Sequence, residues 1–129
     1  MVKTKKTILV IEDHADTQLV VATYIKKHQY ETAFASDAVQ AIGLTRKIRP
    51  DAIILDLGMP GGNGFLVLQR LKALTGLAAI PVIILTADDS PESEQKGLAA
   101  GAVAFLYKPV QEKTLISAVR CAVGEDEVG

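Results

Sequence analysis

Five short, mostly apolar runs recur along the chain, and each is followed by polar or turn-forming residues. They cover residues 7–11, 30–35, 53–55, 81–86 and 103–107, and the second is the weakest. An uninterrupted apolar run of this length is typical of a strand buried on both faces of a sheet. Helical stretches separate the runs. The sequence therefore predicts an α/β fold with a mostly parallel sheet and helices on both faces.

The helical stretches are predicted over residues 17–28, 37–47, from Gly61–Asn63 onward, 90–101 and 111–123. Apolar residues recur in them at the spacing of one helix face. In the first helix these residues are Leu19, Val20, Ala22, Tyr24 and Ile25. In the last helix the residues predicted to point inward are Leu115, Ile116, Val119 and Val123.

Length and composition favour a single small domain. The 129 residues are 49% hydrophobic, which suits a well-filled core, and we expect the domain over residues 7–123 with tails at 1–6 and 124–129. The net charge of −1 gives no electrostatic reason to expect direct nucleic-acid binding. Cys121 is the only cysteine, so no internal disulfide can form. Without a signal peptide or an apolar stretch long enough to span a bilayer, we expect a cytoplasmic protein with no membrane insertion.

Polar residues with complementary chemistry follow four of the five predicted strands. Glu12 and Asp13 follow the first strand, Asp56 the third, Thr86 the fourth and Lys108 the fifth. The carboxyl ends of parallel strands meet at one edge of the sheet, which is where open α/β sheets bind their ligands. We therefore expect these five side chains to face one crevice.

By itself, Asp56 could be a metal ligand, a nucleophile or a helix cap. Two carboxylates ~4 Å apart repel by roughly 4 kcal/mol at an effective dielectric of ~20, so clustered acids tend to raise their pKa values or to bind a cation. An oxygen-only set with room for water and phosphate favours Mg²⁺. Lysine can hold a phosphoryl oxygen, and an aspartate can accept a phosphoryl group covalently.

The order and spacing of these residues resemble the response-regulator receiver domain of two-component signalling. No single one of these motifs is specific for the family, but the motifs together, in this order and spacing, are very specific. The resemblance covers about residues 7–123 and implies a flavodoxin-like (βα)5 fold with strand order 2-1-3-4-5. The matching segments are Glu12-Asp13, Asp56, Met59-Pro60, Asn63-Gly64, Thr86-Ala87 and Lys108-Pro109.

The resemblance implies a role for each acid. Asp56 would be the phosphoacceptor and a ligand of Mg²⁺. Asp13 would bind the ion directly, Glu12 mostly through water, and Gly58 through its backbone carbonyl. Gly58, which has no side chain to position or block water, is also expected to modulate dephosphorylation.

It also implies how a phosphoryl group would be held and sensed. Thr86, Ala87 and Lys108 would form the phosphoryl-binding set, and the bond from Lys108 to Pro109 would be cis. Thr86 and Phe105 would switch conformation together, although a tyrosine is frequent in the family where this chain has Phe105. Asp88 is expected to influence the dephosphorylation rate, either by orienting water or by repelling anionic donors.

Three further features are expected to be structural. His14 lies beside the site but is expected to be a solvent-facing loop residue, and His28 a surface residue. Neither is expected to donate phosphate. Gly61, Gly62 and Gly64 are expected to serve the backbone of the turn rather than to cradle a phosphate.

The implied function is a phosphorylation-dependent switch rather than an enzyme with turnover beyond self-phosphorylation and autodephosphorylation. A histidine kinase or a histidine phosphotransfer protein would be the donor, and the surface made by the fourth helix, fifth strand and fifth helix would change partner affinity. The downstream partner is not identified by the sequence. Phosphorylation-dependent homodimerisation stays open, and so does the choice between a single-domain regulator and part of a larger protein.

Three other functions are weaker. A phosphatase of the haloacid-dehalogenase type usually carries a second Asp two residues after the nucleophile, where this chain has Gly58. A nucleotide-binding module would need a Walker A or G-x-G-x-x-G pattern, and neither is present. The complete set of acids, threonine and lysine argues against a constitutive scaffold.

Overall fold

A computed structural model describes residues 5–59 and 64–125 as a five-stranded parallel sheet with helices on both faces. The strand order β2-β1-β3-β4-β5 confirms the predicted fold. Parts of the predicted tails (1–4 and 126–129) lie outside the described residues, as do the motif and turn positions 60–63. The elements are β1 (Thr7–Ile11), α1 (Ala15–Lys27), β2 (Glu31–Ala35), α2 (Ala38–Ile48), β3 (Ala52–Leu55), α3 (Gly64–Ala73), β4 (Val82–Thr86), α4 (Pro91–Ala99), β5 (Ala104–Tyr107) and α5 (Glu112–Ala122).

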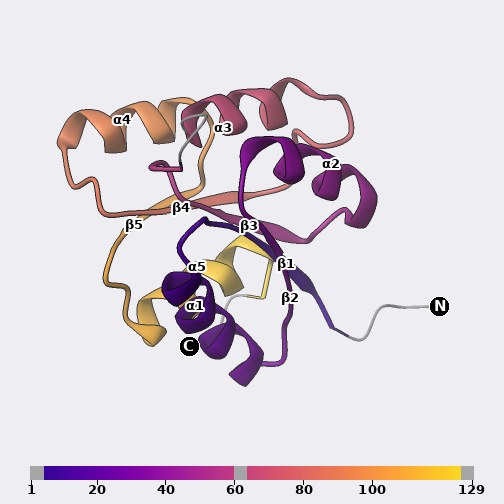
Figure 1. Cartoon of the computed structure of the whole chain (residues 1–129), viewed down its shortest axis with the longest axis vertical. Helices are drawn as coiled ribbons and strands as arrows, with labels where there is room; N and C mark the ends of the chain where they lie inside the picture. Colours follow the sequence, from indigo (N-terminus) through magenta and orange to yellow (C-terminus); the bar gives the residue numbers. More distant parts are fainter. Residues whose placement is uncertain (1–4, 60–63, 126–129) are drawn as a thin grey trace.

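The core has two halves because successive side chains of a strand point to opposite faces of the sheet. In β1, Leu9 and Ile11 pack on the side of α2 and α3, whereas Ile8 and Val10 pack on the side of α1 and α5. The central strands β3 and β4 alternate in the same way and are buried throughout. Figure 1 shows α2, α3 and α4 on one face, and α1 and α5 on the other.

Side chains that cap the helix N-terminus explain where α2 and α4 begin. The Asp37 side chain accepts a hydrogen bond from the backbone N–H of Gln40, which satisfies one of the free donors at the start of α2. Ser90 caps α4 in the same way, and Pro91 occupies the first turn, where its missing N–H costs nothing. For every helix, the predicted bounds lie within a few residues of the observed ones.

The predicted inward face of the first helix is partly wrong. Leu19 and Val20 are 68% and 45% exposed, and the buried residues of α1 are Val21, Ala22 and Ile25. Val21, Ala22 and Ile25 form one stripe along the helix, and Leu19 and Val20 lie outside it because successive residues are turned by about 100° around the axis. Among the described residues, no helix is long and apolar enough to cross a membrane.

Candidate functional site

Strand pairing aligns the carboxyl ends of the strands at one edge. Ile11 pairs with Leu55 across β1 and β3, and the Asp56 N–H donates to the Ile11 carbonyl at 3.0 Å. The Lys108 N–H donates to the Thr86 carbonyl at 2.9 Å, which continues the β4–β5 ladder by one residue. These backbone bonds position the side chains that follow each strand.

The amine of Lys108 bridges two of the acids. Its Nζ lies 2.6 Å from Glu12 Oε1 and 3.3 Å from Asp56 Oδ2. Burial lowers the pKa of Lys108, but the hydrogen bond to Glu12 and the charges of Asp56 and Glu12 outweigh it, so the pKa lies above its usual value. The lysine is therefore charged at neutral pH and offsets part of the repulsion within the acid group. The Lys108–Pro109 peptide bond is cis.

One buried carboxylate oxygen lacks a hydrogen-bond donor. Among the described residues, Asp13 Oδ1 is the buried side-chain oxygen with no hydrogen-bond partner. Ligand atoms of Glu12, Asp13, His14 and Asp56 lie within 4.8 Å of one another. A buried oxygen without a donor among clustered acids fits a bound cation, so the residues present suit the Mg²⁺ that the sequence predicts.

Asp56 is 4% exposed at the end of β3. The Gly58 N–H donates to its Oδ1 at 3.1 Å, which orients the carboxylate. A Cβ added at Gly58 would lie 3.7 Å from the same oxygen, so the missing side chain keeps that side of the carboxylate uncovered. Gly64, at the start of α3, packs against the backbone of Asp56 and Leu57 with no room for a Cβ.

Thr86 is buried, and its hydroxyl accepts a hydrogen bond from the Asp88 N–H at 3.3 Å. The Asp88 carboxylate accepts from the Ser90 N–H at 3.0 Å and from the Ser93 hydroxyl. The hydrogen bonds from Ser93 and Ser90 lower the pKa of Asp88, which holds its charge at the start of α4. Ala87, which lies between Thr86 and Asp88 in the sequence, is exposed.

The half-buried ring of Phe105, on β5, packs against α4. It packs into the core on the α3 side and lies 5.4 Å, centroid to centroid, from Tyr107, which is hydrogen-bonded to Glu94 of α4. A Cβ added at Gly97 of α4 would approach the Phe105 ring to 3.1 Å. Any rotation of Phe105 must therefore be accommodated by α4.

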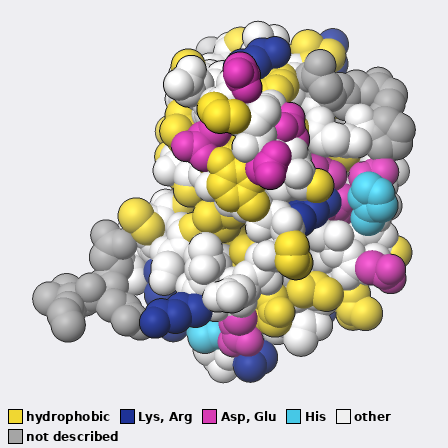
Figure 2. All heavy atoms as spheres, turned by 90° about the vertical axis from the view of Figure 1, so that its left-hand side faces the viewer, with side chains coloured by type: hydrophobic (Ala, Val, Ile, Leu, Met, Phe, Trp, Pro, Cys, Tyr) yellow, Lys and Arg dark blue, Asp and Glu magenta, His cyan; other side chains and the backbone are white. Residues whose placement is uncertain are grey.

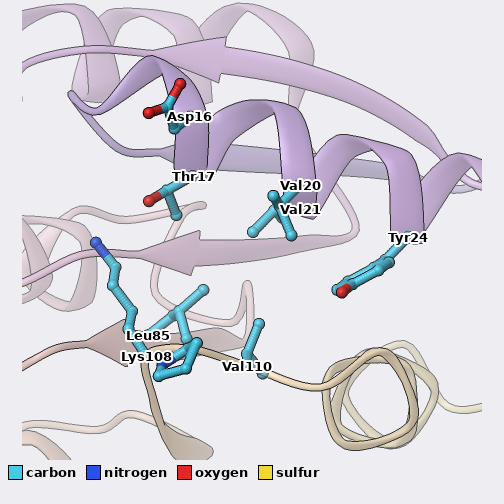
Figure 3. A pocket seen from close by; sticks show the side chains of 9 residues that line it. Asp16, Thr17, Val20, Val21, Tyr24, Leu85, Lys108 and Val110 are labelled. Carbon is cyan, nitrogen blue, oxygen red and sulfur yellow. The ribbon is translucent and has the colours of Figure 1, made fainter.

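An apolar groove of about 500 Å³ lies beside the acid group, between α1 and the segment after β5 (Figure 3). Lys108 lines it, so the groove adjoins the acid group directly. Figure 3 shows the lysine extending toward the side on which Asp16 and Thr17 lie. The apolar residues that line the groove include Val20, Tyr24, Leu85, Pro109 and Val110.

The contacts of His14 with two acids were not predicted from the sequence. Its side chain is 65% exposed, as expected, yet its Nδ1 lies 3.1 Å from Glu12 Oε2 and 3.3 Å from Asp13 Oδ1. Its position directly after two acids was the only available signal. His28 instead contacts Glu112 of α5 at 2.9 Å and is not part of the group formed by Glu12, Asp13 and Asp56.

Residues 8–120 match the family described as the response regulator receiver domain. The chain belongs to this family. The receiver domain is 32% identical over 123 residues to the DNA-binding response regulator MtrA of Mycobacterium tuberculosis, covering 95% of this chain and 53% of MtrA. It is 31% identical to protein PilH of Pseudomonas aeruginosa over 116 residues, covering 90% of this chain and 96% of PilH. The receiver domain thus spans about half the length of MtrA and nearly all of PilH.

Solved structures agree with the fold. The receiver domain is similar to the chemotaxis response regulator CheY4 of Vibrio cholerae, with a TM-score of 0.85 and 29% identity over 92% of this chain and 99% of CheY4. It is also similar to the signal receiver domain of a signal transduction histidine kinase from Syntrophus aciditrophicus, with a TM-score of 0.84, 29% identity and coverage of 92% and 90%. Receiver domains are signalling switches of two-component systems, and this chain is one of them.

Proposed function

We propose that residues 7–123 are a Mg²⁺-dependent phosphoacceptor domain in which Asp56 takes a phosphoryl group from a histidine-phosphorylated protein. One observation carries the proposal: the buried Asp56 shares Lys108 with Glu12, and beside them Asp13 Oδ1 is a buried oxygen without a hydrogen-bond partner. Glu12, Asp13, Asp56 and the Gly58 carbonyl would hold Mg²⁺, and the ion would neutralise charge on the transferred group.

The chemistry is a displacement at phosphorus. A carboxylate oxygen of Asp56 attacks, the bond from phosphorus to the donor nitrogen breaks, and the donor imidazole keeps the electron pair. The hydrogen bond from the Gly58 N–H holds the attacking carboxylate in place. Lys108, already charged, then pairs with a phosphoryl oxygen in exchange for its present contact with Asp56. Thr86 and Ala87 line the remaining side of the phosphoryl group.

The phosphoryl group would act on partner affinity through α4 and β5. When the Thr86 hydroxyl turns to a phosphoryl oxygen, it gives up its bond to the Asp88 N–H, and Phe105 turns into the space that is freed. The switch requires contacts that the phosphoryl group makes better in one state than in the other. Figure 2 shows the side of the molecule on which α4 and β5 lie, where acidic side chains surround hydrophobic ones. The exposed apolar residues of α4, β5 and the turn between them are Leu98, Val103 and Tyr107.

The test uses the wild-type chain and acetyl phosphate. With Mg²⁺ we expect one hydroxylamine-sensitive phosphoryl group per chain, and with EDTA almost none. Sedimentation with and without beryllofluoride then reports whether the phosphoryl state changes the oligomer. Equal incorporation with and without the metal would contradict the proposal. So would turnover of an unrelated phosphomonoester, which would favour a phosphatase.

The groove beside Lys108 is proposed as the docking surface of the donor protein. The donor imidazole must reach the buried Asp56, so the body of the donor has to lie against neighbouring surface. Val20, which lines the groove, is an apolar side chain that is 45% exposed there. A Val20→Asp variant is expected to slow phosphotransfer from a histidine-phosphorylated donor protein at least ~10-fold, the usual cost of losing a central apolar contact.

The matched control is Val39→Asp. Val39 is 83% exposed on α2, across the sheet from the groove. It should leave protein-to-protein transfer unchanged, and both variants should react with acetyl phosphate at the wild-type rate. Equal transfer rates for the two variants would show that the groove is not the docking surface.

A further inference from the structure

His14 closes the β1–α1 loop in a geometry set by its contacts to the acids. It occupies the position before α1, but its side chain makes no capping hydrogen bond to the helix. Instead, its backbone N–H donates to Glu12 Oε2 at 3.2 Å, and its Nδ1 lies 3.1 Å from the same oxygen. The backbone contact holds the loop so that the ring nitrogen faces the acid group.

The distances from His14 Nδ1 to an oxygen of Glu12 and to an oxygen of Asp13 match those between neighbouring ligands on one cation. Adjacent ligands of an octahedral ion with bonds of ~2.1 Å lie ~3.0 Å apart. His14 Nδ1 lies 3.1 Å from Glu12 Oε2 and 3.3 Å from Asp13 Oδ1. Asp13 Oδ1 is also the buried oxygen without a hydrogen-bond partner, so the atom nearest to the imidazole on that side is itself suited to bind a cation.

A nitrogen ligand changes which cations a site prefers. Carboxylate, carbonyl and water oxygens suit Mg²⁺, whereas imidazole suits first-row transition metals such as Co²⁺, Ni²⁺ and Zn²⁺. We propose that His14 is a ligand of the metal site and that it extends the site's preference from Mg²⁺ to divalent transition-metal ions. This inference rests on the metal site of the proposed function, and it adds a residue and a class of cation that the oxygen ligands do not provide.

The other role for His14 is that of a charged partner of the two acids, and the two roles have opposite consequences. A protonated imidazole between Glu12 and Asp13 repels every divalent cation, so its removal would strengthen the binding of both Mg²⁺ and Co²⁺. An imidazole that binds the metal instead strengthens the binding of those cations that prefer nitrogen ligands, such as Co²⁺. Its removal would weaken Co²⁺ binding and leave Mg²⁺ binding nearly unchanged.

The experiment measures Mg²⁺ and Co²⁺ binding to the untagged full chain by calorimetry at pH 7.5, with the visible absorption of Co²⁺ as the second readout. We compare the wild type, His14→Leu and His28→Gln. The His14 variant should bind Co²⁺ at least ~10-fold more weakly. Mutation of a residue that only hydrogen-bonds to a metal ligand already lowers metal affinity by ~10-fold or more, and loss of a ligand should cost at least as much. The variant should lose the absorption band of a nitrogen-ligated ion and keep its Mg²⁺ affinity within about twofold. The His28 variant should match the wild type, because His28 contacts Glu112.

Each other outcome overturns the inference. Unchanged Co²⁺ affinity and absorption in His14→Leu would show that the imidazole is not a ligand. Stronger binding of both ions would assign His14 as a charge partner only. A wild type that binds neither ion would refute the metal site of the proposed function as well, and the Mg²⁺ titration separates this case from the others. Since His14 is mostly exposed, the variant is expected to fold, which circular dichroism checks.

Discussion

Replacing Asp56 with Asn is expected to abolish phosphorylation by acetyl phosphate, a loss of at least about 100-fold. An amide oxygen is a much weaker nucleophile than a carboxylate, and the covalent intermediate needs the carboxylate. The incorporated phosphoryl group is measured by intact-protein mass spectrometry after incubation with Mg²⁺. The variant should bind Mg²⁺ more weakly as well, because it loses one anionic ligand.

Unfolding is not expected to account for this loss. The lost attraction between Asp56 and Lys108 is offset by the lost repulsion between Asp56 and Glu12, so stability should stay within about 1 kcal/mol of the wild type. Asp16→Asn, on the exposed side of α1, is the matched control and should be phosphorylated normally. A phosphoryl group retained on the Asp56→Asn chain would mean that another residue is the acceptor.

Gly64→Ala is expected to destabilise the domain by about 3 kcal/mol, at the upper end for one added methyl group. The new Cβ would lie 2.5 Å from the Asp56 carbonyl oxygen and 2.6 Å from the Leu57 Cα. Both are backbone atoms at the end of β3, so neither can turn away as a flexible side chain would. Thermal unfolding should show a melting temperature lower by about 10 °C. Because Asp56 is displaced, Mg²⁺ affinity should fall too.

Gly43→Ala provides the opposite control. Gly43 lies within α2, and an added Cβ there meets no atom within 4 Å. Alanine loses less backbone entropy in a helix than glycine does, so this variant should gain about 0.5–1 kcal/mol. If both variants changed stability by the same amount, the close packing of α3 on β3 would not be what requires glycine at position 64.

The sequence predicted the sheet well because strand burial leaves a simple pattern. Runs such as residues 53–55 and 82–85 are apolar on every residue, since the strands they form are covered by helices on both faces. The first helix was harder to predict. Leu19 and Val20 carry the same apolar signal as Val21, and only the packing of α1 on the sheet decides which of them is buried.

The order of polar residues after the strands was sufficient to predict the acid group and its lysine, because parallel strands must end at the same edge of the sheet. Pairwise contacts within the group depend on side-chain geometry that no spacing encodes. Lys108 lies closer to Glu12 than to Asp56, and His14 contacts both neighbouring acids instead of only facing solvent. The sequence by itself determined which residues meet at this edge. Only the tertiary structure decided which atoms touch and why position 64 has no room for a side chain, because both follow from how the loops pack between the strand ends and the helices.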